Sequence, residues 1–213
     1  MNNKKEEEKV LIIKPFGPAI GKATIPENII NTLNEYVDKI AEDEIKSNLL
    51  DYGYKLAGNV KQEFKLENEM LEESGWLNFL ANNSKEWINL STKKKITKFE
   101  LITSWIVRQF NNEYNPIHWH NGHISGVGYL KVPSNFGKTF QKNKSYNKNG
   151  HLELIYGSKS FLNNPVFNII PKVGDFYFFP NYLMHTVYPF FDSNEERRSI
   201  SFNARIDIGL YES

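Results

Sequence analysis

Three of the five histidines lie within six residues of one another, at His118, His120 and His123. The first two belong to a short stretch, 115–120, that fits a β-strand. Successive side chains of a strand point to opposite faces, so these two imidazoles point the same way. Neutral imidazole is a good ligand for iron, zinc, copper and nickel. The pair predicts a metal site, and His123 competes for a ligand position if Asn121-Gly122 turns the chain.

A third ligand is expected from His185, which opens another short strand much later in the sequence. It follows an apolar strand at 175–179 that ends at Pro180. In a barrel, two distant strands can present ligands at one mouth. Three ligands on one side of an iron leave positions for substrate and dioxygen. Because the chain has no cysteine, a thiolate site is excluded, and any transition metal must be held by His, Asp or Glu.

The segment 195–203 predicts an anion pocket. Alternation along a strand places four polar side chains on one face: Arg197, Ser199, Ser201 and Asn203. Polar groups inside a barrel are costly unless they bind something. A guanidinium takes a carboxylate through two hydrogen bonds, and Ser199 would add another. Two alternatives stay open: a register slip of one residue substitutes Arg198, or the arginine forms a surface salt bridge with Glu195 or Glu196.

The elements that must position these groups differ between the two halves of the chain. Residues 10–14 fit a short strand. Thr24-Ile-Pro-Glu27 predicts a helix start with Thr24 as the cap, and the apolar spacing carries that helix to Glu42–Asp43. A second helical pattern runs over 68–88 and is interrupted at Gly75. Residues 48–66 show no clear pattern beyond a loop that packs on the domain.

From residue 96 onward, short runs of β-branched and aromatic residues alternate with turn signals. They predict strands at 97–110, 115–120, 125–132, 151–156, 166–170, 175–179, 185–190 and 197–208. Many short strands at such spacing indicate a sandwich or a barrel. Residues 133–150 are polar and predict a mobile loop. We expect a single domain over 1–213, with mostly helical support in 1–95 and a β-core with the metal site in 96–213.

Composition narrows the classes of function. The 213 residues are 40% hydrophobic and include 15 Phe, which is enough for a substantial core. A net charge of +1 gives no indication of nucleic acid or an anionic membrane as partner. The first residues lack the apolar region of a secretory signal, and no apolar run approaches the roughly 18 residues of a membrane span. The expectation is therefore a cytoplasmic protein.

The ordered set of motifs resembles the 2-oxoglutarate- and Fe(II)-dependent oxygenase superfamily. The motifs are His118-x-His120, Ser125-Gly-Val-Gly-Tyr129-Leu, Gly174-Asp175-x-x-x-Phe179-Pro180, His185-x-Val187 and Arg197-x-Ser199-Ile-Ser201-Phe-Asn203. They span about residues 97–208. More narrowly, the chain resembles a family of oxygenases found in marine bacteria and their phages. A phage-encoded member would act in the cytoplasm of its host cell.

This resemblance implies a mainly β fold with N-terminal helices, the double-stranded β-helix or jelly-roll barrel. It implies Fe(II) held by His118, His120 and His185, with no catalytic side chain beyond the metal centre. It also implies 2-oxoglutarate as a small-molecule cosubstrate, with Arg197 and Ser199 holding its distal carboxylate and Tyr129 lining the pocket. The implied reaction is hydroxylation of an unidentified substrate with release of succinate and CO2.

One departure from the superfamily pattern keeps two other functions open. The usual second ligand is a carboxylate, and here it is His120, so the site carries one less negative charge. Three-histidine iron sites also resemble thiol dioxygenases, which would make this a cupin-type dioxygenase that uses no 2-oxoglutarate. The other alternative is a non-catalytic jelly-roll binding module whose histidines hold a structural metal. The sequence names no prime substrate, and an unpaired edge strand would allow a homodimer.

Overall fold

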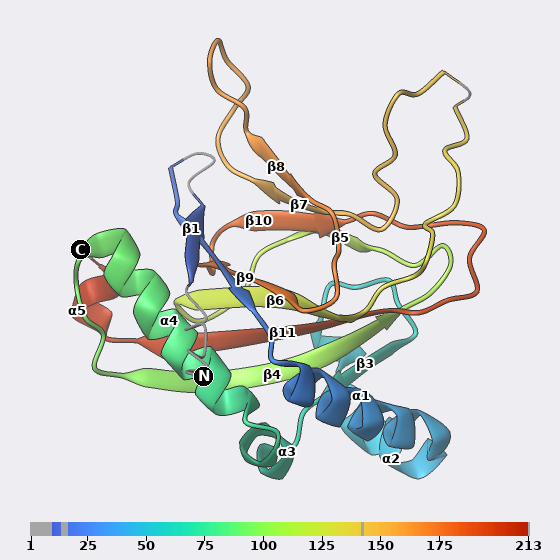
Figure 1. The fold of residues 1–213 in the computed structure, drawn as a ribbon, viewed down its shortest axis with the longest axis horizontal. Helices are drawn as coiled ribbons and strands as arrows, with labels where there is room; N and C mark the ends of the chain where they lie inside the picture. The colour runs from blue at the N-terminus through green and yellow to red at the C-terminus, as the bar shows by residue number, and fades with distance from the viewer. Residues whose placement is uncertain (1–9, 14–16, 142, 213) are drawn as a thin grey trace, which may run out of the picture.

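Two antiparallel sheets dominate the computed structural model, which describes residues 10–13, 17–141 and 143–212 (Figure 1). The larger sheet has the strand order β1-β2-β9-β6-β11-β4-β3, and the smaller has the order β5-β10-β7-β8. The strands of the described residues are β1 Leu11–Ile13, β2 Ile20–Thr24, β3 Gln62–Lys65, β4 Phe99–Gln109, β5 Asn115–His118, β6 Ile124–Lys131, β7 Leu152–Ile155, β8 Val166–Ile169, β9 Asp175–Pro180, β10 Met184–Val187 and β11 Arg197–Ile206. The prediction of a mainly β protein is confirmed.

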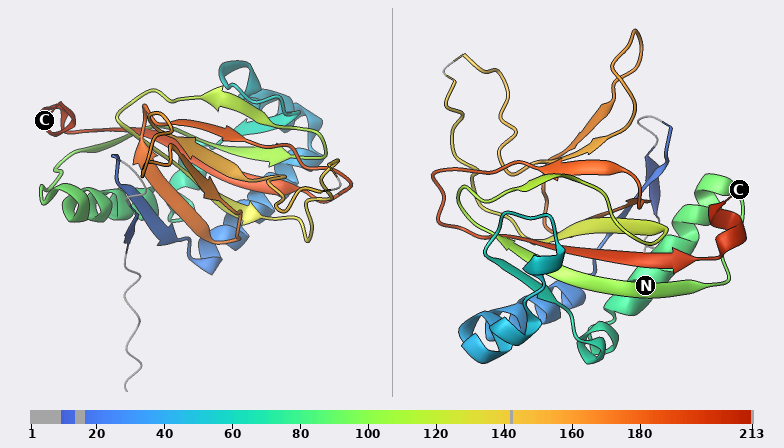
Figure 2. Two further views of the ribbon diagram at one scale, coloured as in Figure 1. Left: turned by 90° about the horizontal axis from the view of Figure 1, so that it is seen from above. Right: turned by 180° about the vertical axis from the view of Figure 1, so that it is seen from behind.

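Four helices lie on the side of the larger sheet that faces away from the smaller one, as the views in Figures 1 and 2 show: α1 Glu27–Glu42, α2 Glu44–Leu50, α3 Asn68–Glu73 and α4 Trp76–Thr92. The 3-10 turn η1 Gly53–Lys55 belongs instead to a segment that lines the space between the sheets, and α5 Ile208–Tyr211 follows the end of β11. The predicted break at Gly75 separates α3 from α4, and this glycine has φ +76°, a left-handed conformation that suits glycine. None of these described helices combines the length and apolarity that crossing a membrane requires.

Helix α1 forms as its apolar spacing predicts, and its end at Glu42 is confirmed. The predicted cap at Thr24 is wrong. Thr24 is the last residue of β2 and pairs with Asp175 of β9, while Pro26 occupies the N-cap position without a side-chain hydrogen bond. The reason is that the preceding residues join the sheet, so the helix begins after the proline, whose fixed φ favours the first turn.

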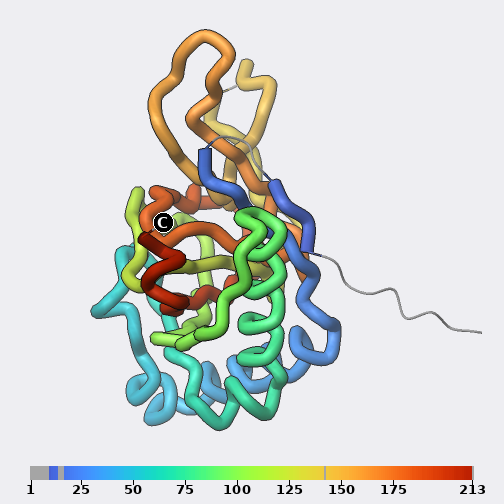
Figure 3. Tube along the Cα trace, turned by 90° about the vertical axis from the view of Figure 1, so that its left-hand side faces the viewer, coloured from blue at the N-terminus to red at the C-terminus, as the bar shows by residue number. Residues whose placement is uncertain are grey.

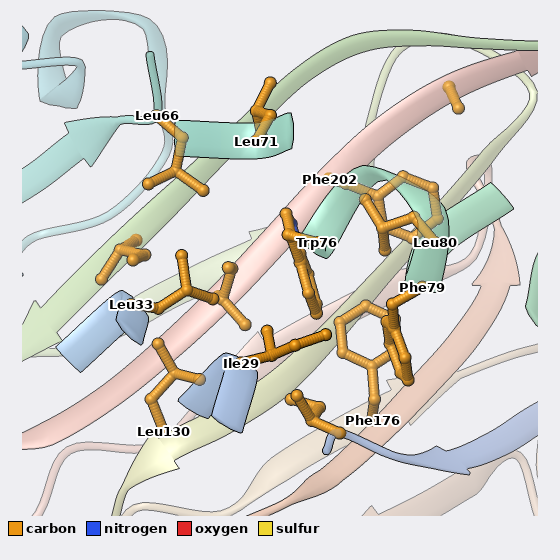
Figure 4. Close-up of a cluster of buried hydrophobic side chains, with 14 of the residues drawn as sticks. Ile29, Leu33, Leu66, Leu71, Trp76, Phe79, Leu80, Leu130, Phe176 and Phe202 are labelled. Carbon is orange, nitrogen blue, oxygen red and sulfur yellow. The ribbon is translucent and has the colours of Figure 1, made fainter. Parts of the chain in front are cut away.

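The main core fills the space between the helices and the outer face of the larger sheet. Figure 4 shows Trp76 and Phe79 of α4 lying beside Phe176 of β9. The ring centroids of Trp76 and Phe79 are 5.2 Å apart, and both rings meet Phe176 edge-on at 5.3 and 5.7 Å. Each fully buried side chain of this size contributes about 1.5–3 kcal/mol. This core holds the larger sheet rigid and so fixes the positions of the side chains on its inner face.

A second, smaller core lies between the two sheets. Its buried residues come from both sheets and are Ile20, Val127, Tyr129, Leu152, Leu154, Ile169, Tyr177, Phe179, Leu183 and Val187. It fills only part of the space between the sheets, and the remainder is the polar cavity that holds the histidines. The inner face of the larger sheet therefore contributes both to the second core and to the polar cavity.

The N-terminal part of the chain is not confined to helical support. Three strands from it, β1, β2 and β3, extend both edges of the larger sheet. The strand predicted at 10–14 appears as β1, with Lys14 outside the described residues, whereas β2 and β3 were not predicted. The segments 133–141, 143–150 and 156–165 project away from the sheets (Figure 3). The first two of them contain no strand or helix, as their polar composition predicts.

Candidate metal and cosubstrate site

The three histidines His118, His120 and His185 come together at one mouth of the space between the sheets. Strands β5 and β10 are antiparallel neighbours, and their register sets His118 directly opposite His185. His120 lies two residues beyond His118, just after β5 ends. One ligand atom from each ring lies within 4.8 Å of the other two, and the Nε2 atoms of His120 and His185 are 3.1 Å apart. Such a cluster suits one transition-metal ion.

Backbone carbonyls fix two of the rings in the orientation that a metal needs. The Nδ1 of His118 lies 2.7 Å from the Pro116 carbonyl oxygen, and the Nδ1 of His185 lies 2.9 Å from that of Leu183. A carbonyl oxygen only accepts hydrogen bonds, so each Nδ1 carries the proton. The lone pair then sits on Nε2, the atom that is free to bind a metal.

Burial keeps the three imidazoles neutral. It lowers the pKa of His185 to about 3, with the neighbouring His118 adding to the shift. Burial also lowers the pKa of His120 well below its usual value and, to a smaller degree, that of His118. A neutral imidazole can bind a metal without first losing a proton, so the cluster is prepared for metal at neutral pH.

A tight turn holds His120 in place after β5. Its backbone N–H donates to the Asn181 carbonyl at 3.0 Å, and the Asn181 amide donates back to the His120 carbonyl at 3.2 Å. Gly122 follows with φ +89°, and a Cβ there would lie 2.8 Å from the Ala204 carbonyl oxygen. The turn therefore requires glycine, both for its left-handed backbone and for its close approach to β11.

The same turn carries His123 away from the cluster. Its ring stacks on Tyr211 with centroids 4.2 Å apart, and its Nδ1 accepts a hydrogen bond from the Ile206 N–H at 3.1 Å. His123 is thus occupied on the α5 side of β11. Of the two candidates for second ligand, His120 lies in the cluster and His123 does not.

A cavity of about 430 Å³ opens beside the histidines. Both sheets and the segment 52–57 line it: Tyr52, Lys55, Leu56, Ala57, Glu63, Trp105, Val107, Asn115, His118, Trp119, His120, Asn121, Val127, Leu152, Phe179, His185, Val187, Ser199, Ser201 and Asn203. Its size is that of a small-molecule site. The polar face predicted for β11 supplies three of these residues.

Behind Ser199 lies a buried guanidinium without a counter-ion. Arg197 is 1% exposed, and its Nη1 donates to Gln109 at 3.0 Å and to the Ser199 hydroxyl at 3.4 Å. Its Nε and Nη2 have no hydrogen-bond partner among the described residues, and neither has the buried hydroxyl of Tyr129. The Tyr129 ring centroid is 5.0 Å from the guanidinium carbon. Burial lowers the pKa of Arg197, which reflects the cost of a desolvated charge.

Arg198 points the opposite way and is fully engaged. It donates to Asp38 of α1 at 2.6 Å, to Glu196 at 2.6 Å and to the Asn34 carbonyl at 3.1 Å. The salt bridge considered for this segment thus belongs to Arg198, on the helix-covered face. Arg197 is the arginine that faces the space between the sheets.

Sequence reasoning missed several residues around the site. His151 is only 9% exposed, and the ring of Phe136 lies edge-on to its imidazole. Gln109, which holds Arg197, gave no signal because its role depends on its pairing opposite Arg197. Glu63 lay in the stretch without a pattern, and alternating charged and apolar residues there resemble an exposed strand.

Comparison with known families decides the class of protein. Residues 103–203 match the family described as "Putative 2OG-Fe(II) oxygenase". Over these residues, which carry the β-core and the site, the chain is a 2-oxoglutarate- and Fe(II)-dependent oxygenase. The matched segment includes the three clustered histidines, Tyr129 and Arg197. The oxygenase is therefore an enzyme whose family uses Fe(II) as metal and 2-oxoglutarate as cosubstrate. A comparison with curated proteins gave no match.

Solved structures with this fold include two prolyl hydroxylases and an epimerase. The prolyl-4-hydroxylase of Pseudomonas putida aligns with TM-score 0.55 and 14% identity over 87% of this chain and 92% of its own. The viral collagen prolyl hydroxylase of Paramecium bursaria Chlorella virus-1, solved with 2-oxoglutarate, gives 0.52 and 15% over 87% and 94%. The α-ketoglutarate-dependent epimerase SnoN from nogalamycin biosynthesis gives 0.58 and 12% over 86% and 76%. At these identities the likeness shows the fold, and the predicted jelly-roll is confirmed.

The residues of this oxygenase fit both groups that its family uses. Three neutral imidazoles with free Nε2 atoms form a suitable donor set for Fe(II). A buried arginine with two unpaired nitrogens, next to a serine and an unpaired tyrosine hydroxyl, fits a carboxylate such as that of 2-oxoglutarate. The orphaned donors are the observation that matters, because buried polar groups are otherwise hydrogen-bonded.

Proposed function

We propose that this oxygenase hydroxylates its substrate with dioxygen, using Fe(II) held by His118, His120 and His185 and 2-oxoglutarate held by Arg197. The observation that carries the proposal is the combination of three converging neutral imidazoles with a buried arginine that lacks a counter-ion, in one space between two sheets. Neither half alone would specify this chemistry, because histidine clusters also bind structural metals and buried arginines also form internal ion pairs.

The protein contributes binding and orientation. The three histidines would occupy one side of the metal and leave the side facing the cavity for cosubstrate and dioxygen. Their backbone hydrogen bonds hold two of the rings in the required tautomer without further rearrangement. When bound together, Fe(II) and 2-oxoglutarate supply oxidising chemistry in which 2-oxoglutarate, dioxygen and a substrate C–H give succinate, CO2 and the hydroxylated product.

Arg197 would anchor the distal carboxylate of 2-oxoglutarate. Its two unpaired nitrogens, Nε and Nη2, lie on adjacent branches of the guanidinium, the fork that takes a carboxylate in two parallel hydrogen bonds. The hydroxyls of Ser199 and Tyr129 would complete the carboxylate's shell. Gln109 holds the remaining branch, so the fork is oriented before the cosubstrate arrives. Binding an anion there also neutralises a charge that is otherwise buried alone.

Aromatic rings shield the metal side of the cavity from water. The Trp105 ring packs against His120 with centroids 5.4 Å apart, and the Phe179 ring packs against His185 at 5.1 Å. A dry environment strengthens the electrostatic interactions of bound groups and limits side reactions. The prime substrate would approach from the opposite wall, formed by the segment 52–57 and Trp119.

A three-histidine site carries one negative charge less than a site with a carboxylate ligand. We expect weaker retention of Fe(II) than in a site with two histidines and one carboxylate, because one charge attraction is missing. The variant His120→Asp restores the superfamily pattern and should tighten Fe(II) binding.

The test is succinate release by the purified chain, measured by mass spectrometry, with Fe(II) and 2-oxoglutarate supplied separately and together. We expect succinate only when both are present, and its loss in Arg197→Met. The matched control Arg205→Met removes an exposed arginine of the same strand that pairs with Glu100 and should retain turnover. Iron-dependent oxygen uptake that ignores 2-oxoglutarate would contradict the proposal and favour the three-histidine dioxygenase instead.

A further inference from the structure

A buried carboxylate in the cavity wall has no role in the function proposed above. Glu63, on the edge strand β3, is 1% exposed and lines the same cavity as the histidines. Neither of its carboxylate oxygens has a hydrogen-bond partner among the described residues. A charge buried without a partner costs several kcal/mol, so such a group is seldom retained for stability alone.

The strand register shows where Glu63 stands relative to the cosubstrate pocket. Glu63 pairs with Val107, Val107 pairs with Ser199, and Ser199 pairs with Tyr129, so the four residues form one row across the larger sheet. Two strand spacings separate Glu63 from Ser199, which amounts to about 10 Å. Glu63 therefore lies on the β3 side of the cavity, two strands away from Ser199, the residue that contacts Arg197.

The segment 53–58 covers the carboxylate and is shaped to let it approach. A Cβ on Gly58 would lie 2.7 Å from Glu63 Oε1 and 3.0 Å from the side-chain oxygen of Asn115, so glycine is needed for this contact. Asn115 begins β5, three residues and thus about 10 Å of strand before His118, so the Glu63 carboxylate lies near the start of β5. Lys55 and Leu56 of the same segment form the outer wall of the cavity, so substrate entry would meet this cover first.

The surroundings of Glu63 favour a cation. Asp51 and Glu113 lie near enough to raise its pKa further after burial has raised it, to about 7 in all. Both of those carboxylates already accept backbone hydrogen bonds, Asp51 from Gly53 and Glu113 from Phe110. The one nearby ammonium in the wall, on Lys55, lies over the rings of Tyr52 and Tyr54 instead.

We propose that Glu63 recognises the prime substrate, and that this substrate is an aliphatic amine or guanidine whose cationic group pairs with the Glu63 carboxylate. The inference rests on the proposed function and adds the substrate class. Glu63 and the three histidines line the same cavity of about 430 Å³, so a C–H several bonds from the nitrogen reaches the metal side while the cationic group pairs with Glu63.

The opposite charges of Arg197 and Glu63 would also direct the cosubstrate and the prime substrate to different places. The dianionic cosubstrate is attracted by Arg197 and repelled by Glu63, and a cationic substrate experiences the reverse. Placing a repulsive group against the wrong ligand is an effective means of specificity. The arrangement therefore accounts for two buried side chains of opposite charge, each with atoms that have no hydrogen-bond partner among the described residues.

The experiment measures how much added amines stimulate succinate release by the Fe(II)-loaded full chain. The probes are L-lysine, L-arginine, putrescine and agmatine, and the neutral counterparts are L-norleucine and L-citrulline. Blocked tripeptides with central lysine or arginine form a second arm that separates a free molecule from a protein side chain. The variant Glu63→Gln keeps the shape of the side chain and removes its charge. Glu63→Ala serves as a second variant if Glu63→Gln folds poorly. Glu73→Gln, an exposed carboxylate in α3, is the matched control.

We expect at least one cationic probe to raise succinate release at least fivefold and its neutral counterpart to have little effect. Glu63→Gln should lose at least tenfold of that stimulation, and Glu73→Gln should retain it. The proposal is overturned if no cationic probe stimulates, if neutral counterparts stimulate equally, or if Glu63→Gln responds like wild type. A calorimetric titration of 2-oxoglutarate without any amine separates the proposed function from the proposed substrate class. If the wild-type protein does not bind 2-oxoglutarate, the proposed function itself is refuted.

Discussion

The two faces of β11 each carry a buried arginine, but the two arginines differ in their hydrogen bonding. Arg197 and Arg198 are adjacent and both almost wholly buried, at 1% and 0% exposed. Arg198, on the helix-covered face, has two carboxylates and a carbonyl as partners. Arg197, on the inner face, has one good neutral partner, Gln109, and two nitrogens without any. Their difference in hydrogen bonding separates a structural charge from a binding charge.

The serines of the two faces repeat this contrast. Ser104, on the helix-covered face of β4, accepts a hydrogen bond from the Trp76 indole at 3.0 Å and donates to the Ser201 carbonyl at 2.7 Å. Ser199, on the inner face, has a single long contact with Arg197 at 3.4 Å. The outer face is satisfied internally and stabilises the fold, whereas the inner face leaves donors for ligands. Three pairs of variants and one single variant test this difference between the two faces.

The largest effect is expected from removing a histidine of the inner space. His185→Ala should weaken binding of Fe(II) at least about 100-fold, because one of three ligands is lost. His123→Ala, which removes a ring stacked on Tyr211, should leave the metal content unchanged. Metal analysis after dialysis measures both. Equal metal content in the two variants would refute the assignment of the site.

The next effect concerns stability and the outer arginine. Arg198→Met should lower the free energy of unfolding by about 2 kcal/mol, because Glu196 and Asp38 each lose one of two cationic partners and keep only Arg108 and Lys131. Arg197→Met should cost much less, since it removes a charge that was not neutralised. Denaturant unfolding of the metal-free variants makes the comparison. A greater loss in Arg197→Met than in Arg198→Met would reverse the roles given to the two faces.

The buried carboxylate on the inner face should make stability depend on pH. The pKa of Glu63 is raised to about 7 in the folded chain, mainly by burial, above its ordinary value of 4.5. The folded state then holds its proton more tightly than the unfolded state, so stability falls as pH rises from about 4.5 to 7 and stays lower above. Glu63→Gln removes this term and should be more stable than wild type by on the order of 2 kcal/mol at pH 8.

At pH 5 the same variant should match wild type closely, because Glu63 is then protonated in the folded protein. Urea unfolding of metal-free protein at pH 5 and pH 8 gives the two differences. A stability gain that is the same at both values would show that the carboxylate has a partner in solution.

The smallest effect is expected from the two serines. Ser199→Ala should weaken 2-oxoglutarate binding up to tenfold, the value of one hydrogen bond to a charged group, with little change in stability. Ser104→Ala should do the opposite and cost about 1–2 kcal/mol of stability, because the buried Trp76 N–H loses its acceptor. Calorimetry measures the affinity for 2-oxoglutarate, and urea unfolding measures the stability. If Ser104→Ala weakened 2-oxoglutarate binding and Ser199→Ala did not, the roles given to the two faces would be wrong.

Local patterns predicted most of the elements in the second half of the chain. The alternation in 197–203 predicted the two faces of β11, and the spacing of His118 and His120 predicted a shared direction for their side chains, since a strand has a fixed period of two. The periodicity of α1 predicted its buried face. These signals lie within single elements, where sequence and geometry are directly linked.

Features that depend on pairing between distant segments were not predictable in this way. Strand β3 joins β4 only through tertiary pairing, so the alternation of Gln62, Glu63, Phe64 and Lys65 gave no sign that the glutamate faces a cavity. The role of Gln109 depends on its position opposite Arg197. The choice between the two arginines depended on where the helices lie, because either could have formed the salt bridge with Glu196.

Calorimetric titration of 2-oxoglutarate into anaerobic Fe(II)-loaded protein measures whether the inner arginine, Arg197, binds the cosubstrate. Wild type and Arg198→Met should bind one equivalent with similar affinity, whereas Arg197→Met should bind at least about 30-fold more weakly, the usual cost of removing one partner of a buried charge pair. Equal affinity in wild type and Arg197→Met would contradict the account.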